Sequence, residues 1–113
     1  MKYRQDQLTD TIKNEVITIL LFQVNNPLLK HVIVTRAKMT KDLKIARIYY
    51  NIPGSLAEQK KVAMSLNRSK SFIRKLLTPK LNVRFVPELE FYYDESQEEL
   101  SKLEDLFHRI HKE

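Results

Sequence analysis

A single glycine, Gly54, is the feature that most narrows what these 113 residues can fold into. Only glycine adopts left-handed backbone conformations freely, and several ligand-binding loops need two or more glycines at close spacing. Phosphate loops of the Walker type, dinucleotide-binding fingerprints and the GxxG loop of a standard KH domain all belong to this group. The chain can build none of them.

The lack of cysteine removes a second set of possibilities: disulfides, thiol nucleophiles and cysteine-ligated zinc or iron–sulfur sites. The length predicts one domain, residues 1–113, that needs no covalent staple. The longest apolar stretch, Val16 to Phe22, is far shorter than the roughly 20 residues that span a bilayer, and the charged N-terminus is unlike a secretory signal. We therefore expect a cytoplasmic protein that does not contact membranes.

The charge is concentrated in the middle of the chain. Residues 1–27 have a net charge of zero, with three basic and three acidic side chains. Residues 28–84 carry 14 basic and two acidic side chains, and residues 85–113 carry three basic and nine acidic ones. A basic block of this kind is typical of a protein that binds a phosphate backbone, with the acidic end facing away from it. The alternative is an ordinary solvated basic surface.

Periodicity predicts a helix over residues 5–24, ended by Asn25-Asn26-Pro27. Two alternating stretches, His31 to Met39 and Lys44 to Ile52, then predict a hairpin that turns at Thr40-Lys41-Asp42. The residues expected on its inward face are Ile33, Thr35, Ala37 and Met39 in the first strand and Ala46, Ile48, Tyr50 and Ile52 in the second.

A second helix is expected from a capping box of Ser55 with Glu58 to about Leu77. Residues 83–93 predict a third strand, in which Pro87 requires an edge position or a bulge. A last helix should follow Ser96. The inward residues expected in these two elements are Val83, Phe85, Leu89, Phe91 and Tyr93 in the strand and Leu100, Leu103, Leu106, Phe107 and Ile110 in the helix. The pattern predicts an α+β domain with helices packed on one face of a three-stranded sheet.

Four stretches follow one another along the chain: 26–29 (NPLL), Asp42-Leu43 with Ala46, Ile48 and Tyr49, 72–74 (FIR), and 86–96 (VPELEFYYDES), which is the most specific. Together they resemble the ribosome-binding factor A family of bacterial small-subunit assembly factors. The resemblance covers nearly the whole chain. It implies a single type II KH-like domain of order α-β-β-α-kink-α-β-α with a mixed sheet, in which a helix kink replaces the GxxG loop. Here Ser69-Lys70-Ser71 stands where the family usually has Ala-x-Gly.

The resemblance also implies a function, which is to bind 16S rRNA in the immature 30S subunit and to help mature the 5′ end of that RNA. The implied partners are the 16S rRNA and the free small subunit, with other assembly factors or GTPases as further candidates. It further implies a monomer without cofactors and a role in cold adaptation. From the residues alone, two alternatives stay open: a KH-like domain that binds other single-stranded RNA or DNA, and a protein-interaction module.

The candidate RNA-binding side chains are basic. They lie on the second helix (Lys61, Arg68, Lys70, Arg74 and Lys75), just after it (Lys80 and Arg84), and on the outward face of the sheet (Arg36, Lys38 and Arg47). Arginine suits phosphate because its planar fork donates two hydrogen bonds, while lysine acts as a mobile point charge. A kink at Ser69–Ser71 would add the N-terminal end of a helix as a further phosphate contact.

No set of residues predicts catalysis or metal binding. Tyr49, beside Arg47, either stacks an unpaired base or packs on the sheet. The pair His108 and His111 lacks a third ligand and is explained by its position near a helix end. Asp94 and Glu95 are interpreted as helix-start residues, and His31 has no partner that would make it a general base. We therefore expect a protein that is not an enzyme.

Overall fold

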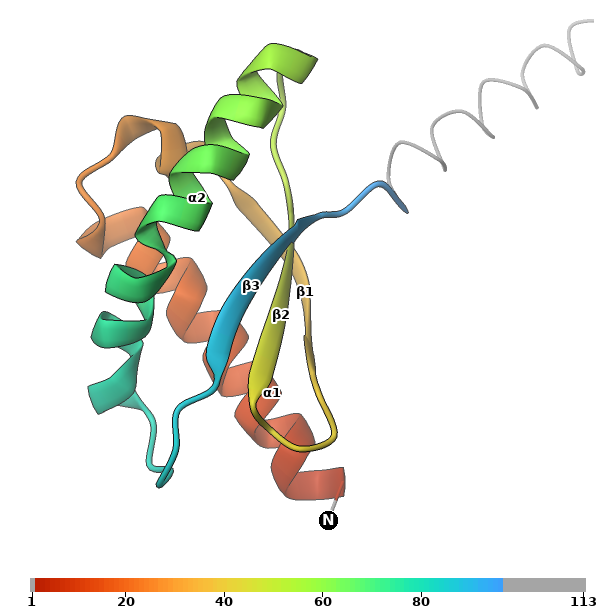
Figure 1. Ribbon diagram of the computed structural model, residues 1–113, viewed down its shortest axis with the longest axis vertical. Helices are drawn as coiled ribbons and strands as arrows, with labels where there is room; N and C mark the ends of the chain where they lie inside the picture. Colours follow the sequence, from red (N-terminus) through yellow and green to blue (C-terminus); the bar gives the residue numbers. More distant parts are fainter. Residues whose placement is uncertain (1, 97–113) are drawn as a thin grey trace, which may run out of the picture.

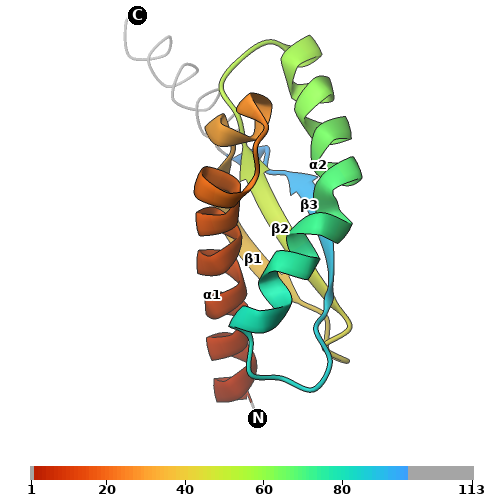
Figure 2. The same ribbon diagram turned by 90° about the vertical axis from the view of Figure 1, so that its left-hand side faces the viewer.

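A three-stranded sheet with two helices on one of its faces makes up the computed structural model, which describes residues 2–96 (Figure 1). The strands are β1 (Ile33–Met39), β2 (Ile45–Asn51) and β3 (Glu88–Tyr93). β2 lies in the centre, antiparallel to β1 and parallel to β3. Helix α1 (Lys2–Thr18) packs mainly over β1, and α2 (Leu56–Leu77) packs over β3. In Figure 2 both helices lie in front of the sheet. The predicted mixed α+β architecture is confirmed, while the predicted last helix lies outside the described residues.

The core lies between the helices and the inner face of the sheet. α1 and the turn after it contribute Ile12, Val16, Ile19 and Leu20, β2 contributes Ala46, Ile48 and Tyr50, and α2 contributes Val62, Leu66, Ile73 and Leu77. Each set has the spacing of its own element, three to four residues on the helices and two on the strand. The predicted inward face of β2 is therefore confirmed, and the buried positions of both helices have the helical period from which these helices were predicted.

The end of the first helix differs from the prediction. Residues Ile19–Gln23 form a π-helical turn, in which the Val24 amide donates to the Ile19 carbonyl, rather than a continuation of α1. Residues Pro27–His31 then form a 3-10 helix, so β1 begins at Ile33 and not at His31. The Asn26 side chain caps this 3-10 helix and donates to the Ser65 hydroxyl on α2, at 2.7 Å.

Because β1 contains a bulge, the side chains at its start face the opposite way from the prediction. The register shifts between Val34 and Arg36, so Thr35 is an extra residue in the ladder. Because one extra residue reverses which side chains face the core, Val34 points inward and Ile33, 55% exposed, points outward. Beyond the bulge Ala37 and Met39 pack against the core as expected.

The hairpin turn contains a left-handed residue that is not glycine. Leu43 adopts a left-handed conformation (φ 62°), which costs a side chain with a Cβ of the order of 1 kcal/mol. The Asp42 carboxylate stabilises the turn by accepting hydrogen bonds from the Thr40 hydroxyl and the Lys44 amide. The chain's one glycine lies elsewhere, before α2, where a Cβ on Gly54 (φ 137°) would collide with the Glu58 side chain.

The third strand is shorter than predicted. It begins at Glu88, directly after the buried Pro87, whose missing N–H cannot contribute to a ladder. Residues 82–87 form a loop, and Phe85 is 77% exposed, so its assignment to the core was wrong. β3 is an edge strand, which is one of the two alternatives predicted for it, although Pro87 precedes the strand and does not lie within it. Leu89, Phe91 and Tyr93 face the core.

α2 is one uninterrupted helix from Leu56 to Leu77, as the periodicity predicted, so no second helix begins at Ser69–Ser71, where the family resemblance implied a kink. Within residues 2–96 neither Ser69 nor Ser71 donates to a carbonyl one turn earlier, the contact by which serine bends a helix. Ser69 instead lies half-buried on the inward face of the helix, and Ser71 is exposed. The helix begins as predicted, with the Ser55 hydroxyl accepting from the Glu58 amide.

This continuity predicts opposite effects for two serine-to-alanine changes. Ser71→Ala should stabilise the protein by about 0.5 kcal/mol, because alanine is the better helix former at an exposed interior position. Ser55→Ala, which removes the cap, should destabilise it by about 1 kcal/mol. Urea unfolding measures both changes. A loss of stability in Ser71→Ala would show that the helix depends on a serine contact at this position.

Candidate nucleic-acid interface

Three cations form a line along the outer face of α2. Lys61, Arg68 and Lys75 are spaced seven residues apart, which places them about 10 Å from one another along the helix axis. All three are exposed, and within residues 2–96 none of them makes an ion pair or a side-chain hydrogen bond. We call these three residues the α2 basic stripe. No acidic side chain of residues 2–96 neutralises these charges, which can therefore attract an anionic ligand.

Two other basic residues of α2 lie on its opposite side, toward β3. Lys70 lines a shallow pocket with Glu90 and Phe91. Arg74 holds the loop before β3, because its Nη2 donates to the Val86 carbonyl (2.7 Å) and its Nε donates to the Pro87 carbonyl (3.1 Å). The predicted cluster of five basic residues on this helix is thus divided between two sides.

The two contacts of Arg74 give it a structural role that can be measured. Arg74→Ala should lower the free energy of unfolding by about 2 kcal/mol, because two carbonyls lose a charged donor. The neighbouring Lys75→Ala removes an exposed, unpaired charge and should change stability by about 0.5 kcal/mol or less. Thermal unfolding of the two variants makes the comparison. Equal stability of both would contradict the role assigned to Arg74.

The basic residues that follow α2 lie near the hairpin turn. Lys80 is exposed at the end of the 3-10 helix Thr78–Lys80 and lines a pocket with Lys41 and Leu43. Arg84 is exposed too, and its guanidinium carbon lies 5.4 Å from the centre of the Phe85 ring. These two cations extend the positive surface beyond the C-terminal end of α2.

The outward face of the sheet carries a separate group of cations. Arg36, Lys38 and Arg47 are exposed there, as strand parity predicted, with Lys38 directly opposite Arg47 in the register. Arg47 pairs with Glu90 on β3 at 3.8 Å. Both helices cover the other face of the sheet (Figure 2), so this group lies on the face that is turned away from α2.

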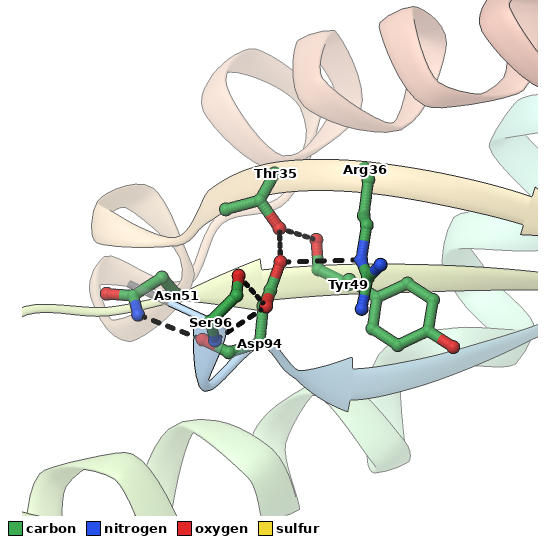
Figure 3. A network of polar contacts seen from close by, with 6 residues as sticks. All are labelled: Thr35, Arg36, Tyr49, Asn51, Asp94 and Ser96. Atoms are coloured by element: carbon green, nitrogen blue, oxygen red, sulfur yellow. Dashed lines mark hydrogen bonds and ion pairs between the residues drawn. The ribbon is translucent and has the colours of Figure 1, made fainter. Parts of the chain in front are cut away.

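A buried carboxylate joins the end of β3 to the bulge in β1 (Figure 3). The Asp94 carboxylate accepts hydrogen bonds from the Ser96 hydroxyl (2.6 Å), the Ser96 amide (3.0 Å) and the Thr35 hydroxyl (2.6 Å). Arg36 Nε lies 3.5 Å from it. The Ser96 and Thr35 hydrogen bonds, with a smaller effect of the Arg36 charge, lower the pKa of Asp94 to about 2.

Sequence reasoning placed Asp94 at a helix start and missed its partner on β1. The bond to the Ser96 amide has the local pattern expected of such a residue. The bond to Thr35, 59 residues away, depends on the bulge that turns Thr35 toward the end of β3. A bulge of this kind has no signature in the residue pattern, because Thr35 fits an alternating strand equally well.

The other candidate residues form no metal site within the described part of the chain. Within residues 2–96 no three His, Asp or Glu side chains come together as metal ligands do, and no helix is long and apolar enough to cross a membrane. His31 is exposed in the 3-10 helix. The pair His108 and His111 lies outside the described residues.

The element order and the mixed sheet define a small α+β domain of KH-like order that presents an exposed basic stripe on its long helix. The sequence model of the family ribosome-binding factor A matches residues 4–107. This chain belongs to the ribosome-binding factor A family.

Individual relatives agree with this assignment. The chain is 38% identical over 107 residues to ribosome-binding factor A of Desulfatibacillum aliphaticivorans, covering 95% of this chain and 87% of that protein. It is similar to a solution NMR structure of a Thermotoga maritima protein described as a candidate ribosome-binding factor A, at 31% identity and a TM-score of 0.71, covering 85% and 92% of the two chains. The fold also matches a homology model of Thermus thermophilus ribosome-binding factor A that was fitted into a cryo-EM map of its complex with the 30S subunit, at 18% identity and a TM-score of 0.66, covering 79% of this chain and 93% of that one.

Proposed function

We propose that this protein is a small-subunit assembly factor that binds 16S rRNA in the immature 30S subunit through the α2 basic stripe. The observation that carries the proposal is the line of three exposed cations that have no partner among residues 2–96. Family membership supports the target, since a Thermus thermophilus relative with this fold has been fitted into a 30S complex.

The α2 basic stripe suits a phosphate backbone better than a protein or a small molecule. Two large apolar side chains, Met64 (56% exposed) and Phe72 (49% exposed), lie between its cations and can cover sugar and base surfaces. Cations at regular spacing provide affinity and orientation but little sequence specificity. The ribosomal location must then come from the shape of the RNA and from neighbouring subunit components.

We infer the more detailed role of the protein from its membership of the family. Bound to the immature subunit in the cytoplasm, the protein helps mature the 5′ end of 16S rRNA and keeps unfinished subunits out of translation, with special importance in the cold. It acts as a monomer and without a cofactor or a chemical step of its own. Other assembly factors or GTPases are its further partners.

Further contacts on the α2 side are assigned to Lys70, Lys80 and Arg84, which we place at the margin of the RNA. Together with the α2 basic stripe they would engage about six phosphates, which predicts a slope of log affinity on log salt concentration of about −4 to −5. Arg74 is left out of this set because its guanidinium is already hydrogen-bonded to the loop before β3.

Co-sedimentation tests the proposal. Purified protein is centrifuged with free small subunits, free large subunits and assembled ribosomes over a series of salt concentrations. We expect selective association with small subunits that weakens as salt rises. Equal binding to all three particles would contradict the ribosomal role and favour a general single-stranded RNA- or DNA-binding domain.

A further inference from the structure

A row of three flat side chains crosses the outward face of the sheet. Arg36 on β1 is opposite Tyr49 on β2, and Tyr49 is beside Tyr92 on β3. The guanidinium carbon of Arg36 lies 4.2 Å from the centre of the Tyr49 ring. The two tyrosine rings are 5.7 Å apart and inclined by 30°. We call these three residues the sheet platform.

The sheet platform is held in place by the protein before any ligand arrives. The buried Asp94 carboxylate fixes Arg36, and is itself fixed by Thr35 and Ser96 (Figure 3). The Tyr92 hydroxyl donates to Glu90 Oε1 at 2.7 Å. Groups that are already ordered lose little conformational entropy on binding, so a stacked ligand would keep most of its contact energy.

The platform also has free surface. The Arg36 side chain is 48% exposed and Tyr92 is 41% exposed, while Tyr49 is half-buried beneath the arginine. A planar ligand can therefore lie on the outer side of the guanidinium and against the Tyr92 ring. Guanidinium planes and tyrosine rings are the surfaces on which proteins stack unpaired bases.

The charges around the platform indicate how a nucleotide would lie. In the next row of the sheet Lys38 is opposite Arg47, whose charge Glu90 partly neutralises. Lys38 makes no ion pair within residues 2–96. Among residues 2–96, Glu88 and Glu90 on β3 are the more exposed acidic residues of this face, while the Asp94 carboxylate is buried beside Arg36. A phosphate would thus be attracted to the β1 side and repelled from the β3 edge.

We propose that the sheet platform binds an unpaired nucleobase of single-stranded RNA, with the adjoining phosphate at Lys38. This site rests on the proposed function in that RNA is the ligand, but it is separate from the α2 basic stripe and lies on the face of the sheet that is turned away from α2. Through the two surfaces the protein would hold a phosphate backbone on α2 and a single-stranded segment on the sheet.

Fluorescence anisotropy with the full-length protein tests the site. The probes are a labelled single-stranded RNA of about eight nucleotides and an abasic strand of equal length, which has the same phosphates but no bases. We expect the strand with bases to bind about tenfold more tightly. Tyr92→Leu should reduce this preference to about twofold or less, whereas Tyr92→Phe, which keeps the ring, should retain it. Arg36→Lys keeps the charge but loses the plane, and should also reduce the preference.

The outcomes separate this site from the α2 basic stripe. Reversing Arg68 and Lys75 to glutamate changes α2 and not the sheet, so the tighter binding of the strand with bases should remain. An unchanged preference in Tyr92→Leu, or equal binding of both strands by the unaltered protein, would overturn the proposed site. Neither result would affect selective binding of small subunits, which tests the proposed function by itself. Circular dichroism and the thermal midpoint establish that each variant is folded.

Discussion

The double variant Arg68→Glu/Lys75→Glu should bind small ribosomal subunits about 100-fold more weakly than the unaltered protein. Both side chains are exposed and have no partner within the described part of the chain, so their replacement removes only contacts to a ligand. A charged contact to phosphate contributes about 1.5 kcal/mol or more, and two of them correspond to about 100-fold in affinity. The slope of log affinity on log salt should become less negative by about 1.5.

A charge-matched control distinguishes this effect from a general change in net charge. Lys41→Glu/Lys44→Glu makes the same change at the hairpin turn, where both residues are exposed. We expect the control to lose at least tenfold less affinity in the same co-sedimentation assay. If the two double variants lost equal affinity, binding would depend on total charge and not on the α2 basic stripe.

The largest effect on stability is expected at Asp94. Asp94→Asn should lower the free energy of unfolding at pH 7 by about 2 kcal/mol, because the amide carries no charge to stabilise the Thr35 and Ser96 donors or Arg36. The side chain is 5% exposed, so water replaces these contacts poorly. Urea unfolding of the two proteins at pH 7 measures the difference.

The same residue predicts how the difference depends on pH. The folded-state pKa of Asp94, about 2, lies below the ordinary value of 3.8, so its ionised form is the one that stabilises the fold. This contribution is complete well above pH 3.8 and is lost as the pH falls through 2. The stability gap between the unaltered protein and Asp94→Asn should therefore close over that interval.

Asp42→Asn is the matched control for this titration. Its hydrogen bond from Thr40 also lowers the pKa of Asp42, but the side chain is exposed in the turn and screened by water. The Asp42 variant should show a smaller gap at pH 7. A pH-independent gap for Asp94→Asn would show that the carboxylate charge does not contribute to stability.

The parts of the fold that follow a simple period were predictable. The inward positions of α2 recur every three to four residues, and those of β2 recur every two, because each element buries one face. The start of α2 was also readable, since Ser55 is a strong N-cap residue and hydrogen-bonds only three positions along the chain. Local chemistry of this range is contained in a short stretch of sequence.

The parts that depend on long-range contacts were not predictable. The residues around Phe85 alternate as in a strand. However, β3 begins only after Pro87, which cannot donate a hydrogen bond to the ladder. The alternating residues that precede Pro87 therefore form a loop. The bulge at Thr35 is stabilised by a hydrogen bond to Asp94, which lies 59 residues further along the sequence. A second helix start at Ser69–Ser71 was implied by the family resemblance, whereas α2 continues through these residues to Leu77.

The candidate site shows the same division. A helical wheel places Lys61, Arg68 and Lys75 on one face, and the structure confirms that arrangement and their exposure. The wheel cannot show that Arg74, only one position from Lys75, reaches the loop before β3 and hydrogen-bonds two of its carbonyls. The pairing of Arg36 with Asp94 was hidden for the same reason, since neither the bulge nor the end of the strand was located.

Directed cleavage of 16S rRNA is the most direct test of the interface. Because the chain has no cysteine, Met64→Cys on α2 creates a unique attachment point for an iron chelate that generates hydroxyl radicals between the cations of the α2 basic stripe. Lys41→Cys at the hairpin turn provides the control position. Within bound small subunits we expect strong, localised cleavage of 16S rRNA from position 64 and several-fold weaker cleavage from position 41. Co-sedimentation of the labelled protein without cleavage from position 64, or with equal cleavage from both positions, would contradict the placement of RNA on α2.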